Sequence, residues 1–523
     1  MSDDNSTSFN LVAHLMSIYL KRIVLGIISF TLVGCSVIPV PFTQDEISTR
    51  AEEDKSQLTV DQEPVTKAIS LYEAMARALG YNLDLRLELF KKTLATRQLD
   101  LTRYEQLPDL VASVGYDSRD NFSGASSTSL TTGQQSLESS TSSDKDVISA
   151  DLGLSWNILD FGVSYYRAQQ AADRVLIAEE QKRNIINRIL KDVRIVYWRA
   201  VSNDRLIHRL EDLMIRVTQA LEDSKQVEYK RLSTPLAALT YQRELIDNKE
   251  ELQELYEGLS LAKIQLASLM NLPLGEEYEL VVNERPEDIP SLGYTPQFME
   301  LLALENRSEL REISYQKRIN SQETRAALLS LLPGIDLNFG KNYSDNSFLF
   351  NTNWLSFGAR VSWNLLNVFK YPATKRVAET QAEILDAQRL ALSMAILTQV
   401  HIGLAQYEHA KNKYLTAADY NETQIKILEQ IQTAAEVDAA SQQDLIREEM
   451  NALVSEVRYD IAYAELEGAY ANSYAAMGID PSFDNLDTEN IESLAKSLEY
   501  FFEAQKQNKS SMSMQLKNKE SFK

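Results

Sequence analysis

The sequence predicts a mostly helical protein with a small β part, in which one structural unit occurs twice. Three observations support this prediction: a set of segments that recurs, two very long stretches almost free of Gly and Pro, and short segments with a period of two. Only 17 Gly and 12 Pro occur in 523 residues, which favours long helices over a sandwich or a doubly wound sheet. A repeat of this size indicates internal pseudo-symmetry.

The repeat is read from three pairs of segments. Leu107-Pro108 recurs 225 positions later as Leu332-Pro333, and the same offset relates residues 82–86 to residues 307–311. Residues 155–159, Ser-Trp-Asn-Ile-Leu, return as Ser-Trp-Asn-Leu-Leu at 362–366, now offset by 207. The first half therefore contains a longer insertion, and we expect it in the Ser/Thr-rich run from Ser118 to Ser143.

The N-terminus has the pattern of a secretory signal peptide over residues 1–34. Lys21 and Arg22 precede an apolar run, and the run ends in small residues before Cys35, the one cysteine of the chain. This end resembles a bacterial lipoprotein lipobox, which implies cleavage before Cys35, acylation of its thiol (a palmitate-type anchor) and, with Ser36 next, outer membrane retention. The alternative is a buried helix with an incidental free cysteine. Translation may start at Met1 or Met16.

A linker over residues 35–64 leads to Val65–Gln106, where apolar residues recur with helical spacing and Gly80 is expected to divide two helices. The period then changes from 3.6 to 2. Apolar residues alternate with small or polar ones over 148–157 and over 355–364, and Leu110–Tyr116 and Ile335–Phe339 are their expected partner strands. The sequence thus predicts one strand hairpin in each half, within 107–157 and 333–364.

Strands with one apolar and one polar face are typical of transmembrane β-barrels. A half-buried soluble hairpin shows the same alternation, so one strand alone does not decide between them. Four strands cannot close a barrel around a polar interior, because even eight leave room only for side chains. If the polar face lines a lumen, several chains must share the barrel.

The longest segments predict two helical hairpins, over 164–271 and 373–477. Residues 164–231 contain neither Gly nor Pro, and a helix of that length would be about 100 Å long. Return segments follow at about 236–270 and 441–477. Such lengths indicate coiled-coil or tube packing; a solvated structural rod is the alternative. No segment after the signal peptide reaches the roughly 18 to 20 continuous apolar residues of a spanning helix.

Composition and motifs argue against several functions. The net charge is −22 and no basic stripe offsets it, so nucleic acid is not an expected partner. The four His residues are scattered, and no activated-nucleophile motif or phosphate-binding loop with the required spacing occurs. We expect no enzymatic activity, no cofactor and no metal site.

The order of these segments resembles the TolC family of outer membrane efflux ducts over nearly the whole mature chain. Leu71-Tyr72-Glu73-Ala74 and the later Asn82-Leu83 are similar to the opening pattern of the family. Residues 156–162 resemble its junction between strand and helix. Both repeats end as in the family, at residues 269–273 and 477–481. Each motif is loose, and the resemblance depends on their order and duplication.

The resemblance implies a homotrimer whose chains each donate four strands to a twelve-stranded barrel in the outer membrane, with Asp151, Asp336 and Arg360 in its lumen. The long helices would form a periplasmic tunnel, joined through an adaptor protein to an inner membrane pump. The repeats would span 65–290 and 291–483, followed by a C-terminal segment, 484–523, with a disordered basic tail. The implied function is the passive exit duct of an efflux or type I secretion system. The alternative is a structural coiled-coil lipoprotein without a conducting lumen.

The resemblance also implies a gate and a docking surface. Asp444 corresponds to the first of two aspartates that ring the periplasmic entrance in the family, whereas the second position holds Arg447. The alternative is an ordinary surface pair on a helix, worth tenths of a kcal/mol. The hairpin tips expected to contact the adaptor lack the Gly often found there. They contain Arg231, Leu232, Ser233, Val437, Asp438 and Ala439.

Overall fold

The computed structural model describes residues 39–504, apart from residues 59, 61, 137, 231–233, 283–288, 290, 438 and 482–488. The chain divides into two compact units, Met1–Asp61 and Gln62–Lys523. The described part of the first unit contains helix α2 (Gln44–Gln57), which begins with a capping box between Thr43 and Glu46 and buries none of its residues. The predicted signal peptide and Cys35 lie outside the described residues.

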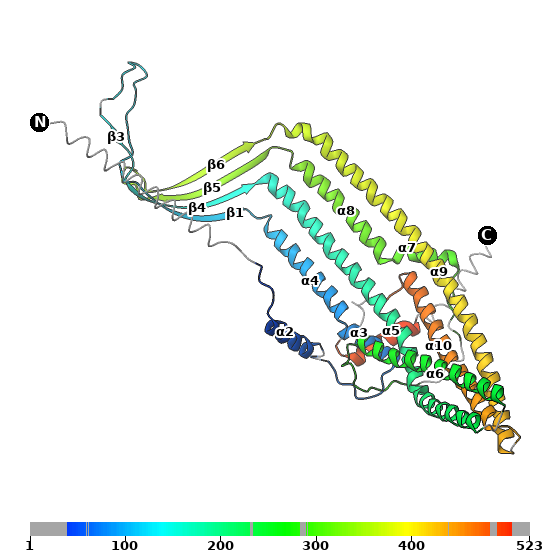
Figure 1. Cartoon of the computed structure of the whole chain (residues 1–523). Coiled ribbons are helices and arrows are strands. Elements are labelled where there is room, and N and C mark those ends of the chain that lie inside the picture. The colour runs from blue at the N-terminus through cyan, green and yellow to red at the C-terminus, as the bar shows by residue number, and fades with distance from the viewer. Residues whose placement is uncertain are drawn as a thin grey trace, which may run out of the picture. The chain divides into compact units, whose positions relative to one another are not determined.

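The second unit contains two equivalent series of elements (Figure 1). The first series is α3 (Leu71–Tyr81), α4 (Leu83–Tyr104), β1 (Asp109–Ser118), β4 (Asp146–Asn157), α5 (Ile158–Tyr229) and α6 (Pro235–Leu269). The second is α7 (Pro296–Asn306), α8 (Ser308–Leu329), β5 (Gly334–Ser344), β6 (Asn353–Ser362), α9 (Asn367–Glu436) and α10 (Gln442–Ala476). The predicted fold class, mostly helical with a small β part and an internal repeat, is confirmed.

The four long strands form one antiparallel sheet in the order β1-β4-β5-β6. The central pair, β4 and β5, joins the two repeats, with Leu154 opposite Phe339. Strands β1 and β6 each pair on one side only, so both edges of the sheet are open within the chain. Strands β1, β4 and β5 are longer than the alternation predicted, whereas β6 has the predicted length and begins and ends two residues earlier.

The longer insertion of the first repeat lies between β1 and β4, where the Ser/Thr-rich run predicted it. It contains a small ribbon of β2 (Gly124–Ala125) and β3 (Ser140–Thr141). Residues 345–352 make the corresponding connection in the second repeat. Asp144 joins the two connections, because its carboxylate accepts hydrogen bonds from the backbone N–H and the hydroxyl of Ser347 at 2.5 and 2.9 Å.

The division between α3 and α4 was predicted at Gly80, and this prediction is wrong. The break lies at Asn82, whose extended backbone ends α3 and whose side chain accepts hydrogen bonds from the N–H groups of Asp84 and Leu85. Asn is a preferred N-cap because its short side chain satisfies these N–H groups. Gly80 instead lies in α3, where a Cβ would be 3.1 Å from the side chain of Ile491.

Both long helices begin about six residues before the predicted points. In α5 the Asn157 side chain accepts hydrogen bonds from Leu159 and Asp160, so Asp160-Phe161-Gly162 forms the first turn of the helix and not a turn that precedes it. In α9 the helix begins at Asn367 and contains Pro372. Pro372 is the sixth residue of this helix, so its missing N–H removes one i→i−4 hydrogen bond near the start of α9.

Helices α4, α5, α8 and α9 continue from β1, β4, β5 and β6 in the same order (Figure 1), and each packs on the next. Farther along, α6 packs on α5, and α10 packs between α5 and α9. Asn271 lies two residues past the end of α6 and Gly478 two residues past the end of α10, both with positive φ, and Leu272 and Ile479 donate the closing hydrogen bonds back to the helix. These are Schellman-type ends.

Helix α4 starts where α6 ends, and α8 starts where α10 ends. The Asn82 side chain donates a hydrogen bond to the Leu269 carbonyl at 3.3 Å, and the Arg307 guanidinium donates one to the Ala475 carbonyl at 3.4 Å. We call the contact between α6 and α4 the first joint and that between α10 and α8 the second joint. In each half, one helix therefore runs uninterrupted beside a pair of helices connected at a joint.

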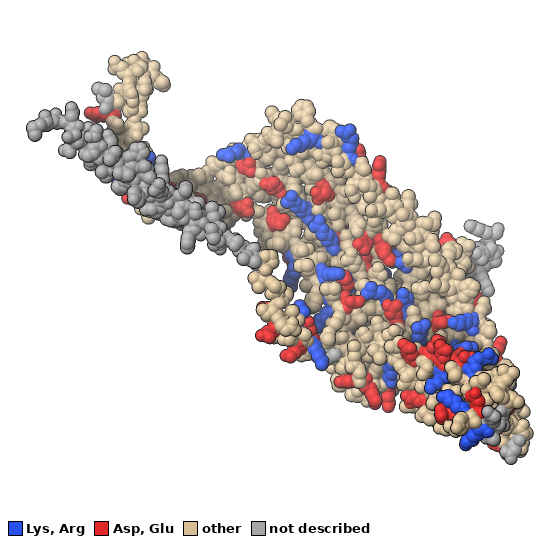
Figure 2. Space-filling model, viewed as in Figure 1, with Lys and Arg blue, Asp and Glu red and all other residues tan. Residues whose placement is uncertain are grey.

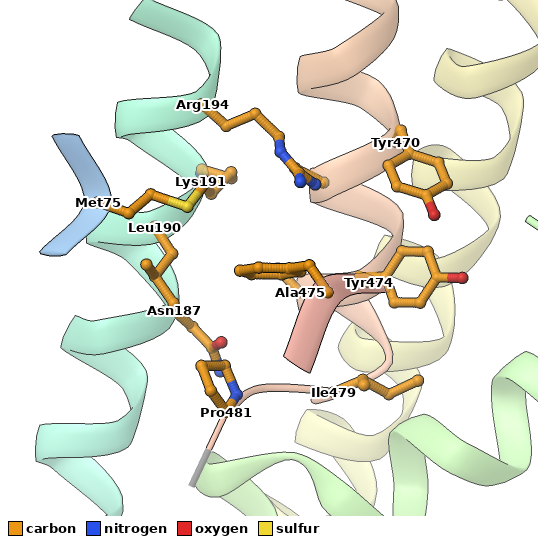
Figure 3. Close-up of a pocket in the computed structure, with 12 residues that line it drawn as sticks. Met75, Asn187, Leu190, Lys191, Arg194, Tyr470, Tyr474, Ala475, Ile479 and Pro481 are labelled. Atoms are coloured by element: carbon orange, nitrogen blue, oxygen red, sulfur yellow. The ribbon is translucent and has the colours of Figure 1, made fainter. Parts of the chain in front are cut away.

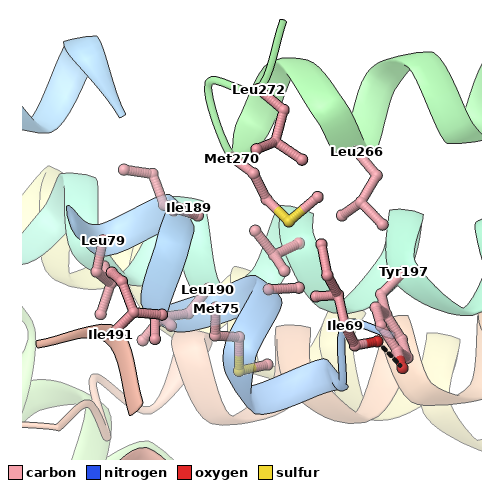
Figure 4. Close-up of a cluster of buried hydrophobic side chains, with 14 of the residues drawn as sticks. Ile69, Met75, Leu79, Ile189, Leu190, Tyr197, Leu266, Met270, Leu272 and Ile491 are labelled. Atoms are coloured by element: carbon pink, nitrogen blue, oxygen red, sulfur yellow. Dashed lines mark hydrogen bonds between the residues drawn. The ribbon is translucent and has the colours of Figure 1, made fainter. Parts of the chain in front are cut away.

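The largest buried cluster surrounds the first joint (Figure 4). Met75 of α3, Leu190 and Tyr197 of α5 and Met270 pack there, together with Ile69. The Tyr197 hydroxyl donates to the Ile69 carbonyl at 3.2 Å. Burial raises the pKa of Tyr197, which keeps the phenol a neutral donor. The joint is thus held by apolar packing in which the Tyr197 hydroxyl is satisfied.

Helix α9 contains an 18-residue stretch apolar enough in composition to cross a membrane, with mean hydropathy 1.2 and 22% of the stretch buried. This match to a membrane-spanning helix rests only on the length and composition of the stretch. The helix has 70 residues, so it is about 105 Å long, more than three times the thickness of a hydrocarbon core. We interpret the stretch as an apolar side surface of a longer helix.

Candidate functional site

One face of the four-stranded sheet is apolar across all strands. Because residues directly opposite each other in an antiparallel pair point to the same side, the register defines this face. Along one row Leu110, Leu154, Phe339 and Phe357 are neighbours in adjacent strands. Lys341, between Leu152 and Leu355, and Asp146, opposite Ser118 at the end of β4, are the charged residues at the described positions of this face. The face also includes Ala112, Val114, Tyr116, Ile148, Ala150, Trp156, Ile335, Leu337, Tyr343, Ala359 and Val361.

The opposite face is largely polar and contains the three residues predicted to line a lumen. Asp151 accepts a hydrogen bond from the Ser113 hydroxyl at 2.5 Å, and Asp336 accepts one from the Asn157 amide at 2.7 Å. Asp336 lies directly opposite Arg360 across β5 and β6. The structure therefore brings Asp336 and Arg360 together and places Asp151 on the same face, two strands away from Arg360.

The edges of the layer carry apolar stripes. On α4, Leu87, Phe90, Leu94 and Leu101 follow coiled-coil spacing and are exposed, with Phe90 61% and Leu101 63% accessible. On α9, Val377, Met394 and Ile402 are exposed by 71%, 66% and 51%. Large apolar side chains arranged in this way usually mark an interaction surface. They continue the open edges of β1 and β6 along the helices.

Asp444 and Arg447 lie in the first two turns of α10, near the helical hairpin tips. Asp444 forms a capping box with Ser441, whose hydroxyl donates to the carboxylate at 2.6 Å. That hydrogen bond, the backbone of Ser441 and the charge of Arg447 hold the pKa of Asp444 below its usual range. The carboxylate is therefore ionised and locally satisfied at neutral pH.

The Arg447 guanidinium contacts three carboxylates. Its atoms lie 2.6 Å from Asp444, 3.2 Å from Glu448 and 3.9 Å from Glu244 of α6. The first two contacts are within α10, and the third connects α10 to the neighbouring hairpin. The structure thus brings the two predicted gate residues together as a pair within one chain.

The predicted adaptor-contacting residues are only partly described. Val437 is 72% exposed at the end of α9, and Ala439 donates its backbone N–H to the Ala434 carbonyl. Arg231, Leu232, Ser233 and Asp438 lie outside the described residues. On the face seen in Figure 2, charges of both signs are interspersed and gather toward this end of the helices.

Sequence reasoning missed a buried cation close to the joints (Figure 3). Arg194 reaches from α5 toward α10 at the wall of a cavity of about 40 Å³. Its guanidinium lies 4.9 Å from the Phe502 ring centroid, and its Nε lies 3.6 Å from Glu467. A single Arg in a helical run gives no signal of burial. Arg194 fastens the helical residues 491–504 to α5, which is a structural role.

Among the described residues no three His, Cys, Asp or Glu side chains gather in a way that could hold a metal ion. Asp151, Asp336 and Asp444 each accept a hydrogen bond from a neighbouring side chain, as described above. The arrangement as a whole therefore presents surfaces, edges and tips and no assembled reaction centre in the described part of the chain.

Solved structures with the same arrangement are outer membrane channels. CmeC of Campylobacter jejuni matches with a TM-score of 0.61 and 14% identity, over 88% of this chain and 97% of that chain. The open state of MtrE of Neisseria gonorrhoeae matches with a TM-score of 0.57 and 15% identity, over 78% and 89%. VceC of Vibrio cholerae matches with a TM-score of 0.57 and 12% identity, over 78% of this chain and 97% of that chain.

The chain has the TolC-type outer membrane channel fold. No family model matches the sequence, and no curated protein matches it either. At these identities the likeness concerns the arrangement of the backbone. In this TolC-type fold the chain presents a sheet with one apolar and one polar face, apolar stripes on α4 and α9, and two helical hairpins.

Proposed function

We propose that the protein is a homotrimeric outer membrane channel that forms the exit duct of a tripartite efflux or type I secretion system. The observation that carries the proposal is the four-stranded sheet, which is apolar on one face, polar on the other and open at both edges. An open sheet edge in a membrane would leave backbone groups without partners. Joining the β6 edge of one copy to the β1 edge of the next satisfies these groups.

Three copies would close a twelve-stranded barrel with its apolar face toward lipid. The stripes on α4 and α9 support the same arrangement, because they place exposed apolar side chains along both edges of the helical layer. Asp151, Asp336 and Arg360 would then face the lumen. The 72-residue α5, about 108 Å long, would carry the wall of the duct through the periplasm.

We propose three further properties of the protein, concerning its membrane anchor, its partners and the mode of conduction. Cys35 anchors the protein in the outer membrane through acylation. The tips around Arg231–Ser233 and Val437–Ala439 contact a periplasmic adaptor, which connects the duct to an inner membrane pump. Conduction is passive, and the protein carries out no catalysis. Replacement of Cys35 by Ser should abolish the lipid mass increment of the mature protein, which mass spectrometry measures.

We also propose that Asp444 and Arg447 form the periplasmic gate. Threefold symmetry would gather three Asp444 carboxylates around the axis, as in charged rings of cation-selective pores, and Arg447 would hold them through the pair described above. Asp444→Ala and Arg447→Ala should raise single-channel conductance and weaken block by divalent cations. Asp247→Ala, on the exposed surface of α6, is the control. Unchanged conductance and block would leave only a surface ion pair.

The test of the duct combines mass and conductance. The purified full chain should be a trimer and should conduct in planar bilayers. Leu94→Glu, in the α4 stripe, should break the trimer and abolish conductance, whereas Thr96→Glu, on another side of the same helix, should do neither. Correct trimers that never conduct would contradict the duct and favour a structural coiled-coil lipoprotein.

A further inference from the structure

A polar groove runs along the second joint, with α10 as its floor and α5 and α9 as its walls. Two cavities of about 400 and 510 Å³ form it, and Lys191, Gln406 and Asn472 line both. The floor is made of small residues. Gly468 lies so close to α5 that a Cβ would be 2.6 Å from the Ile195 side chain. The groove is therefore built into the packing of the three helices.

The ionisable side chains that line the groove are mainly cationic, although the chain as a whole is acidic. The whole protein has a net charge of −22, yet six Lys or Arg side chains and only two carboxylates line the two cavities. The cationic residues are Arg183, Arg188, Lys191, Arg199, Arg307 and Lys413, and the acidic ones are Glu309 and Glu465. A local excess of positive charge in an acidic protein attracts anions to one place.

Four of the six cations already have close carboxylate partners. Arg183 pairs with Asp480 and Glu180, and Arg188 lies 2.9 Å from Asp84. Arg307 pairs with Glu309 at 2.6 Å, and Lys413 with Glu465 at 2.7 Å. These cations are neutralised within the protein and mainly hold the groove in shape.

The remaining two cations are available to a ligand. Lys191 has one ion pair among the described residues, with the adjacent Asp192 at 3.6 Å, and Arg199 has none there. They lie eight residues apart on α5, so their backbones are about 12 Å apart along the helix. A ligand that meets both must be elongated and must carry negative charge at more than one point.

The neutral lining narrows the ligand class further. Side-chain amides of Asn184, Asn187, Gln399, Gln406 and Asn472 line the groove, and no Phe, Tyr or Trp lines either cavity in the described chain. Amides offer hydrogen bonds to oxygen-rich groups, whereas a planar or apolar ligand would find no ring to stack on. A hydrophilic oxyanion fits this lining.

We propose that the groove binds an elongated hydrophilic anion with at least two phosphate or carboxylate groups, held between Lys191 and Arg199. The binding requires only the packing of α5, α9 and α10 within one chain. It is therefore independent of whether the trimer conducts, and a failure of one proposal leaves the other standing.

Isothermal titration of the full-chain protein with inorganic tripolyphosphate at low ionic strength tests the site. We expect saturable binding of one anion per chain, and binding about tenfold or more weaker in the double variant Lys191→Gln/Arg199→Gln, because two charge-assisted contacts are lost. Arg243→Gln/Lys249→Gln, on α6, removes the same two residue types elsewhere and should bind as the wild type does.

A charge-conserving variant separates binding from folding. Lys191→Arg/Arg199→Lys keeps both charges and should bind within about threefold of the wild type. Equal binding by the Gln double variant and its α6 control would overturn the proposal, as would the lack of saturable binding in the wild type. Equally tight binding of neutral maltotriose would overturn it too, because the groove would then select for hydroxyl groups and not for charge.

Discussion

The two joints perform the same connection with different chemistry. At the first joint Asn82 caps α4 and donates to the end of α6. At the second, the equivalent Arg307 gives α8 no side-chain cap. Its guanidinium instead holds Glu309 and donates to the end of α10. The duplication thus preserved the geometry of the joint, while the residue at its centre diverged. The divergence also placed a cation beside the polar groove.

The largest difference between the joints is expected at their left-handed residues. Gly478 has φ +68, and a Cβ there would lie 2.9 Å from backbone atoms of Asn306 and Arg307. Asn271, with φ 56, already has a side chain at the equivalent place. Gly478→Ala should lower the free energy of unfolding by about 3 kcal/mol, and Asn271→Ala by about 1 kcal/mol. Guanidinium unfolding in detergent measures both. Equal losses would contradict the tighter second joint.

Exchange of the caps is the next largest effect. Asn82→Ala should cost about 1 kcal/mol, because α4 loses its N-cap. Arg307→Asn should be more stable than Arg307→Ala by about 1 kcal/mol, since Asn can cap α8 as it caps α4. The same unfolding measurement applies. If Arg307→Asn is no more stable than Arg307→Ala, an Asn side chain does not cap α8 at the second joint as Asn82 caps α4 at the first.

The pH dependence of the second joint follows from Glu309. Burial alone would raise the pKa of Glu309, but the hydrogen bonds and charge of Arg307 outweigh it and hold the pKa below its usual range. A depressed folded pKa adds stability above the unfolded value, near 4.5, and this stability is lost as the pH falls through the folded value. The wild type should therefore lose its advantage over Arg307→Ala as the pH is lowered below about 4.5. A constant difference across this range would contradict the coupling.

A smaller effect is expected on the apolar face of the sheet. Lys341 lies there one row from the Tyr343 end of β5, whereas the residue 225 positions earlier is Tyr116. A lysine on a lipid-facing surface costs about 0 to 1 kcal/mol near the interface and more toward the midplane. Lys341→Tyr should therefore stabilise the protein in lipid by up to about 1 kcal/mol. Thermal unfolding in nanodiscs measures this, and destabilisation would place the residue in water.

The smallest effect is expected from the insertion that distinguishes the first repeat. Residues 122–141 include the β2–β3 ribbon, while Asp144 holds the neighbouring connection. Replacement of 122–141 by a short Gly-Ser linker should leave the melting temperature unchanged within about 2 °C, because exposed loops contribute little to stability. Asp144→Ala should lower it more than the deletion does. The opposite order would show that the ribbon supports the sheet.

Much of the fold was predictable because it depends on spacing. The repeat, the alternating strands and the long helical runs are periodic patterns, and such patterns can be recognised in a single sequence. The helix boundaries were less predictable. Gly80 was the expected break, but the helix ends at Asn82, whose extended backbone ends α3 and whose side chain caps α4. Pro372 was expected to precede α9, yet the helix begins five residues before it and continues through it at the loss of one backbone hydrogen bond.

The candidate sites divide in a similar way. Asp151, Asp336 and Arg360 fell on one face because strand periodicity determines faces. The polar groove could not be predicted, because its residues come from three helices that are distant in the sequence and only packing brings them together. In the sequence Lys191 and Arg199 do not differ from other cations on helices. The structure distinguishes them, because the other four cations of the groove have close carboxylate partners.

The joints also determine where the helical layer can bend. In each half a continuous helix, α5 or α9, runs beside a pair of helices that meet at a joint without a covalent connection there. A continuous helix resists bending along its whole length, whereas two abutting helices can tilt against each other by breaking one hydrogen bond and rearranging a few contacts. A sideways force at the tips would therefore produce curvature at the level of the joints. The sheet end and the tip end of the layer would then tilt relative to each other about the two joints.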